Sequence, residues 1–221
     1  MSKRGLIFDL DGTLWDACPQ IADSWNEYIL HTAPQYGIRL TEHDLRRACG
    51  LTMKAIGDLL FPQIPEKERD LLTEGCCEYE VEYLKKAGGD VYDGVRETLE
   101  RLKADWHLYI VSNCQVGYVE DFLDWSRTWD LFEDFENFGR TGKGKADNIR
   151  LLCERNGLTE AVYVGDTQGD CDSAMEAGVP FLLAAYGFGH VEGCPRVSSF
   201  RELPEELPGM GDIRIRPGKQ A

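Results

Sequence analysis

Short apolar runs alternate with helical patterns along most of this chain, and this alternation constrains the fold more than any other feature. Four runs are short enough for buried strands, and each ends near polar residues or glycine: residues 5–10, 107–111, 161–165 and 180–184. Helical patterns lie between or after them, at residues 95–104, 116–125, 145–156 and 170–177. Strand–helix alternation of this kind predicts an α/β fold with a doubly wound parallel sheet.

Residues 15–89 interrupt this alternation, because they contain several amphipathic helical patterns and no convincing strand. The pair Gly88-Gly89 is a candidate hinge at which the chain returns to the alternating part. A chain of 221 residues suits one core with an inserted subdomain better than two independent domains. We therefore expect an α/β core formed by residues 1–14 and 90–221, and a helical cap formed by residues 15–89.

The composition narrows the classes of partner. A formal net charge of −15 opposes binding to phosphate backbones, so we expect no nucleic-acid partner. The apolar run near the N-terminus is too short for a signal peptide or a membrane span, so we expect a cytoplasmic protein without membrane contact. The eight cysteines are scattered without metal-binding spacings, which favours reduced thiols. We expect a monomer or a weak homodimer.

The strongest functional signal is the segment DLDGTL at residues 9–14, which directly ends the first predicted strand. Ligands of doubly wound sheets bind at the carboxyl ends of the strands, so this position favours a site. Asp9 and Asp11 would point to the same side of an extended segment and could divide nucleophilic and acid–base work, while Gly12 permits a tight turn. An incidental polar turn is the alternative, although two acids that close a buried strand need a metal or a cation nearby.

Other polar motifs occupy comparable positions later in the chain. Ser112-Asn113 follows the second predicted strand, the acidic segment 165–170 follows the third, and Lys145 precedes a helical pattern. In this order the motifs resemble those of the haloacid dehalogenase superfamily, whose phosphatases carry a D-x-D-G-T motif after the first strand. The resemblance covers about residues 5–189. The inserted helical segment is similar to the helical cap of the phosphoglycolate-phosphatase-like branch.

The resemblance implies a Mg²⁺-dependent phosphatase that acts on a small phosphorylated metabolite. Asp9 would attack phosphorus and become an aspartyl phosphate, and Asp11 would exchange protons with the leaving alcohol and then with water. The Mg²⁺ ligands would be the Asp9 carboxylate, the backbone carbonyl of Asp11 and the Asp166 carboxylate. Lys145 would neutralise charge during transfer, and Asp170 would orient the lysine or metal-bound waters. The residues implied in holding phosphoryl oxygens are Gly12, Thr13, Ser112 and Asn113.

Three choices stay open at this point. Lys143 is a second candidate for the catalytic lysine, but we favour Lys145 because an Asp147 or Asn148 cap would open a helix beside it. Residues 46–54 of the expected cap carry basic and polar groups that either face the site or form a solvated helix end. A sugar phosphomutase of the same superfamily, or a regulatory protein that binds a phosphorylated ligand with little turnover, is the alternative function.

Overall fold

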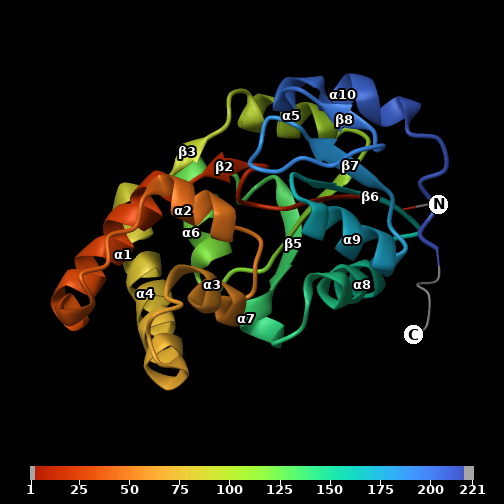
Figure 1. Ribbon diagram of the computed structural model, residues 1–221. Helices are drawn as coiled ribbons and strands as arrows, with labels where there is room; N and C mark the ends of the chain where they lie inside the picture. The colour runs from red at the N-terminus through yellow and green to blue at the C-terminus, as the bar shows by residue number, and fades with distance from the viewer. Residues whose placement is uncertain (1–2, 217–221) are drawn as a thin grey trace.

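A parallel sheet forms the centre of the protein (Figure 1). It has six strands in the order β5-β4-β1-β6-β7-β8. The computed structural model describes residues 3–216, so residues 1–2 and 217–221 of the expected core lie outside the described residues. Strand β1 pairs with both β4 and β6, and its residues Leu6, Ile7 and Phe8 are fully buried. The strands are β1 (Arg4–Phe8), β4 (His107–Ser112), β5 (Phe132–Asn137), β6 (Glu160–Gly165), β7 (Phe181–Ala184) and β8 (Arg196–Val197).

Helices cover both faces of this sheet. On one face, Leu6 and Phe8 of β1 belong to a cluster that includes Leu99 of α5 and Phe122 of α6. On the other face, Ile7 belongs to a cluster that includes residues of α8 and α9. The alternation of inward-facing residues along β1 thus confirms the predicted doubly wound α/β fold. The covering helices are α5 (Val95–Leu102), α6 (Tyr118–Ser126), α8 (Lys145–Asn156), α9 (Gln168–Ala177) and α10 (Leu203–Glu206).

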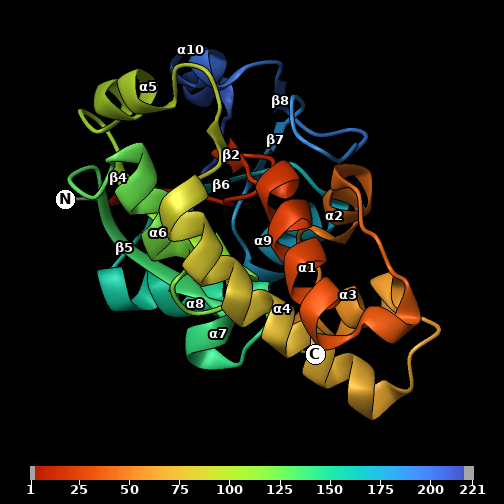
Figure 2. The ribbon, with the colours of Figure 1, turned by 90° about the vertical axis from the view of Figure 1, so that its left-hand side faces the viewer.

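The segment between β1 and α5 leaves the sheet and returns to it through a two-stranded antiparallel ribbon. The ribbon pairs β2 (Trp15–Asp16) with β3 (Asp90–Val91). Between these strands the chain forms four α-helices, and α1 and α4 lie side by side away from the sheet (Figure 2). These helices are α1 (Cys18–Thr32), α2 (Glu42–Ala48), α3 (Met53–Leu60) and α4 (Glu66–Ala87).

Strand β5 is the principal element that the sequence patterns do not predict. Its sequence, FEDFEN, is rich in acidic residues and has no apolar run. The strand lies at the edge of the sheet, where it pairs with β4 alone and therefore needs less apolar surface. All eight cysteines of the chain are free thiols. Within residues 3–216, none of the helices combines the length and the apolar character needed to cross a bilayer.

Candidate active site

Asp9 follows β1 directly, and its backbone N–H donates to the carbonyl of Val164 in β6 at 2.8 Å. This bond extends the sheet by one residue and fixes the position of the Asp9 side chain, which is almost fully buried. The chain then turns at Gly12, whose φ of +77° lies in the region that side chains disfavour. A Cβ atom at Gly12 would also lie 2.2 Å from Oδ2 of Asp166. Glycine is therefore required at this position for two separate reasons.

Lys145 lies between two buried carboxylates. Its Nζ donates to Oδ1 of Asp9 at 2.9 Å and to Oδ1 of Asp170 at 2.5 Å. All three side chains are buried. Lys143, in contrast, is exposed on the loop before α8. The structure thus brings Lys145, and not Lys143, to Asp9.

The sequence argument for Lys145 was wrong in one detail. Helix α8 begins at Lys145 itself, and the preceding Gly144 gives no side-chain cap. Asn148 instead holds the loop before the helix, because it accepts from the Thr141 hydroxyl at 2.8 Å and donates to the Lys143 carbonyl at 3.1 Å. The first turn of α8 therefore positions Lys145, and the hydrogen bonds of Asn148 in that helix hold the preceding loop in place.

Asp166 and Asp170 flank the start of α9 and have different surroundings. Oδ2 of Asp170 accepts from the backbone N–H and the hydroxyl of Thr167, at 3.0 and 2.7 Å, within a reciprocal cap of the helix. Because its Oδ1 bonds Lys145, both oxygens of Asp170 have partners. Asp166 accepts from the backbone N–H of Phe188 at 2.6 Å, but its buried Oδ1 has no partner among the described residues. Asp166 therefore has an oxygen free to bind a cation.

The buried charges of this cluster do not balance. Asp9, Asp166 and Asp170 each offer an oxygen within 4.8 Å of the others, and Lys145 is the basic side chain that pairs with Asp9 and Asp170. Burial, followed by repulsion from Asp170, raises the pKa of Asp9 well above its usual value. Burial also raises the pKa of Asp166 to about 7. Burial alone would lower the pKa of Lys145, but the two adjacent carboxylates outweigh it and raise that pKa. Such a cluster is stabilised by one further cation.

The Asp11 side chain lies apart from this carboxylate cluster. Its Oδ1 accepts from the hydroxyl of Tyr118 at 2.6 Å. Burial raises the pKa of Asp11 to about 6, although the hydrogen bond from Tyr118 opposes this effect. Asp9 and Asp11 therefore have distinct environments, one beside a lysine and the other beside a phenol.

The residues expected to hold phosphoryl oxygens do not all reach the same cavity. Ser112, the last residue of β4, and Asn113 line a pocket together with Asp9 and Asp11. The Asn113 amide donates to the carbonyl of Gly50, between α2 and α3, at 2.8 Å. Gly12 and Thr13 are not among the residues that line this pocket. Thr13 is buried, and its hydroxyl has no partner among residues 3–216.

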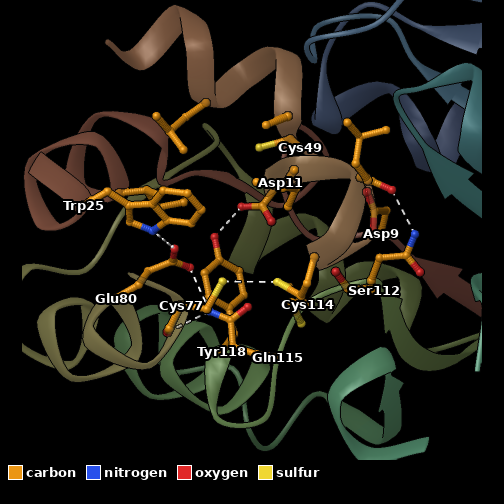
Figure 3. Close-up of a pocket in the computed structure, with 18 residues that line it drawn as sticks. Asp9, Asp11, Trp25, Cys49, Cys77, Glu80, Ser112, Cys114, Gln115 and Tyr118 are labelled. Carbon is orange, nitrogen blue, oxygen red and sulfur yellow. Dashed lines mark hydrogen bonds between the residues drawn. The ribbon is translucent and has the colours of Figure 1, made fainter. Parts of the chain in front are cut away.

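The inserted helices close the other side of this pocket, which has a volume of about 60 Å³. Trp25 of α1 and Glu80 of α4 point toward each other there, and the Trp25 indole N–H donates to Oε2 of Glu80 at 2.5 Å (Figure 3). Gln115 donates to Oε1 of Glu80 at 2.9 Å. Tyr118, whose hydroxyl donates to Asp11, lines the same pocket. No sequence motif marks Glu80, Gln115 or Tyr118. The sequence around Trp25 shows only apolar residues at helical spacing, which is typical of a helix packed against a core.

The basic residues of segment 46–54 lie elsewhere. Arg46 forms an ion pair with Asp16 at 2.8 Å, and Arg47 lines a separate surface hollow. Thr52 accepts from the backbone N–H of Ala55 at the start of α3. The parts of this segment that face the pocket are uncharged: Ala48, Cys49, Gly50, Leu51 and Met53.

Comparisons with known proteins agree with this fold. The family model of haloacid dehalogenase-like hydrolases matches residues 6–184. A phosphoglycolate phosphatase of Nitrosospira multiformis is 30% identical, over 84% of this chain and 84% of its own length. One of Pseudomonas putida is 28% identical, over 95% of this chain and 80% of its own length.

Solved structures give the same result for the fold. A predicted phosphatase from Clostridium acetobutylicum superposes with a TM-score of 0.77 at 24% identity, over 95% of this chain and all of its own. A haloacid dehalogenase-like family hydrolase from Streptococcus pneumoniae superposes with a TM-score of 0.78 at 18% identity, over 93% of this chain and 98% of its own. Because the family model matches well over half of the chain and includes every acidic residue of the cluster, the chain belongs to the haloacid dehalogenase-like hydrolase family.

Proposed function

We propose that this protein is a Mg²⁺-dependent phosphatase that hydrolyses a small phosphomonoester through an aspartyl phosphate on Asp9. One observation carries the proposal: Lys145 bridges Asp9 and Asp170 inside a buried cluster of acids at the carboxyl ends of the strands. Relatives named phosphoglycolate phosphatase, at 25–30% identity, support the phosphatase activity. Phosphoglycolate is accordingly one substrate to test.

In the first half of the reaction, an oxygen of Asp9 forms a bond to phosphorus while the bond to the ester oxygen breaks. Asp11 gives its proton to the leaving alcohol. In the second half, Asp11 takes a proton from a water molecule that attacks the same phosphorus, and the Asp9 carboxylate is released with inorganic phosphate. The separate surroundings of the two acids, a lysine for Asp9 and Tyr118 for Asp11, suit these separate tasks.

The other polar groups of the site orient Asp9 or bind the phosphoryl oxygens. Lys145 opposes the rise in the pKa of Asp9 and orients its carboxylate, and Asp170 keeps the lysine in place. Ser112 lines the pocket beside Asp9, where its hydroxyl would bind a phosphoryl oxygen. The amide of Asn113 uses one N–H for Gly50, so its second N–H remains to donate to phosphate.

The donor set fits Mg²⁺, which prefers hard oxygen ligands. Asp9 and Asp166 would hold the ion, with the backbone carbonyl of Asp11 as a third ligand. The unpartnered Oδ1 of Asp166 and the close approach that Gly12 permits support this choice. When bound, Mg²⁺ supplies positive charge that lets an anionic nucleophile approach an anionic substrate.

Residues 15–89 form a cap over the site in this proposal, while residues 1–14 and 90–221 form the core. The bond from Asn113 to the Gly50 carbonyl and that from Gln115 to Glu80 tie the inserted helices to the loop after β4. Closure at these contacts would exclude bulk water from the phosphoryl group.

The test is hydrolysis of p-nitrophenyl phosphate with Mg²⁺ and with EDTA, combined with rapid-quench detection of phosphoprotein. The wild-type protein should release inorganic phosphate in the presence of Mg²⁺ and form a base-labile phosphoprotein. Asp9→Asn should form none, while Asp23→Asn, a change at an exposed residue of α1, should behave as the wild type. Phosphoprotein in Asp9→Asn would refute the assignment. Transfer of phosphate to a sugar instead of water would favour a mutase.

A further inference from the structure

The pocket beside Asp9 and Asp11 has an unusual charge for a site that receives an anionic substrate. No lysine, arginine or histidine is among its described lining residues. Besides the two catalytic acids, its ionisable lining groups include Glu80, a carboxylic acid that is only 4% exposed. The other lining groups from the inserted helices are largely apolar: Ile21, Trp25, Leu45, Leu51, Met53 and Ile56.

The hydrogen bonds of Glu80 are those of an ionised carboxylate. Oε2 accepts from the indole N–H of Trp25, which has no lone pair with which to accept a proton in return. Oε1 accepts from the amide N–H of Gln115, whose orientation is set by a second bond to the Cys77 carbonyl at 3.3 Å. Both Glu80 oxygens therefore face donors, and neither faces a group to which a carboxyl proton could be given.

This carboxylate lacks a cationic partner. Within residues 3–216, none of the ion pairs of the protein includes Glu80. Burial accordingly raises the pKa of Glu80 to about 8, despite the bonds from Gln115 and Trp25. Buried carboxylates are normally paired, because an unpaired buried charge is costly. Burial therefore favours the protonated acid in the free protein, and a cation bound beside Glu80 would favour the carboxylate to which Trp25 and Gln115 donate.

We propose that the leaving alcohol of the substrate carries a small cation, an ammonium group, which pairs with Glu80 while the phosphoryl group lies at Asp9. The substrate class is a phosphorylated amino alcohol. This inference rests on the proposed phosphatase function. It deepens that function, because Glu80 would bind the leaving group and takes no part in the chemistry at phosphorus. A substrate with a carboxylate on its leaving group would instead meet Glu80 without a compensating base.

Two other features agree with this class. The cavity of about 60 Å³ extends from Asp9 to Glu80 and is small, which favours a short leaving group over a large one. A larger open hollow shares Met53, Cys77 and Gln115 with the pocket. Its charged lining comprises three acids and one base, Asp70, Glu74, Glu78 and Lys54, and so favours approach of a cationic group.

The experiment compares three esters of similar size with the Mg²⁺-loaded protein: 2-aminoethyl phosphate, n-propyl phosphate and phosphoglycolate. The first two differ in an ammonium and a methyl group at the same place. We expect kcat/KM for the aminoethyl ester to exceed that for the propyl ester by at least about tenfold, and phosphoglycolate to be the poorest. Glu80→Gln should bring the aminoethyl-to-propyl ratio to within about threefold of one. Glu82→Gln, at an exposed position of the same helix that lines neither the pocket nor the hollow, should keep the wild-type ratio.

Direct binding separates this inference from the phosphatase proposal. Calorimetric titration of the same three esters, in the presence of Mg²⁺, should give the same order of affinity whether or not the esters are hydrolysed. Absence of turnover with a Glu80-dependent preference for the aminoethyl ester would overturn the phosphatase and leave the cation pocket in place. Binding or turnover that favours phosphoglycolate or the propyl ester in the wild-type protein would overturn the inference, as would an unchanged ratio in folded Glu80→Gln.

Discussion

Replacing Glu80 with glutamine should remove much of the pH dependence that this buried acid gives to the free energy of unfolding. Burial raises the pKa of Glu80 from 4.5 to about 8 in the folded protein, so the fold favours the protonated form. A group whose pKa is raised on folding contributes stability that is fully present below the unfolded pKa. That contribution is lost as the pH rises through the folded pKa. The relevant window therefore runs from about 4.5 to about 8.

The magnitude follows from the two ends of that window. A rise in pKa from 4.5 to about 8 corresponds to about 5 kcal/mol, as an upper limit reached only when the whole window is crossed. Glutamine does not ionise, so the variant lacks this term. Its amide would place an N–H against either Trp25 or Gln115, both donors, and this loss of one hydrogen bond costs about 1–3 kcal/mol relative to the ionised carboxylate. The protonated carboxyl of the wild type meets a similar mismatch through its O–H at low pH.

The assay is urea unfolding of wild type and Glu80→Gln at pH 5.5, 7.0 and 8.5. Other acids near Glu80 titrate in the same range, among them Asp11 with a pKa of about 6 and Asp121 with one of about 7. The quantity to compare is therefore the difference between variant and wild type at each pH. This difference should move in favour of the variant by about 2–4 kcal/mol from pH 5.5 to 8.5. A difference that stays flat within about 0.5 kcal/mol, as expected for the exposed Glu78→Gln, would refute the reasoning.

Three further changes test the core of the site. Lys145→Ala should lower kcat by at least about 10²-fold, whereas Lys143→Ala should keep it within about threefold in the same steady-state assay; the reverse ranking would move the role to Lys143. Asp11→Asn should lower turnover of alkyl phosphates by about 10²–10⁴-fold and form phosphoprotein more readily from p-nitrophenyl phosphate, whose leaving group needs no proton; equal rates of phosphoprotein formation from both would contradict the acid role. Gly12→Ala should displace Asp166 and, measured by calorimetry, weaken Mg²⁺ binding; unchanged affinity would count against the metal site.

The residues of the carboxylate cluster could be predicted from sequence because their places depend on the backbone of the sheet. Asp9 and Asp166 each follow a buried strand, and β1 and β6 are neighbours in the sheet. Parallel neighbours bring the residues after their ends together. Lys145 could be named but not explained, because its helix begins without the polar cap that the sequence predicts. The order of motifs along the chain therefore predicted which residues meet, and the local reason was found only in the structure.

The pocket beside Glu80 could not be predicted in this way. Glu80 lies within a charged helical segment, where a buried acid looks like its exposed neighbour Glu78. Its burial depends on the packing of α4 against α1, which brings Trp25 to one carboxylate oxygen. Gln115 reaches the other oxygen from the loop after β4. No spacing within the sequence encodes a contact of three segments that lie so far apart.

The carboxylate cluster is fixed by the sheet, whereas Glu80 is fixed by helix packing. The relatives therefore inform the reaction and the substrate specificity to different degrees. Few substitutions are tolerated at the phosphoryl site. Its tight turn requires glycine at Gly12, and its lysine is held between two buried acids. The surroundings of Glu80 restrict substitution less, because many side chains could fill the same space between two helices. At 25–30% identity, relatives can share the first arrangement without the second. The reaction is therefore better inferred from the family, while the leaving group is better inferred from the charge and hydrogen bonds of Glu80 in this chain.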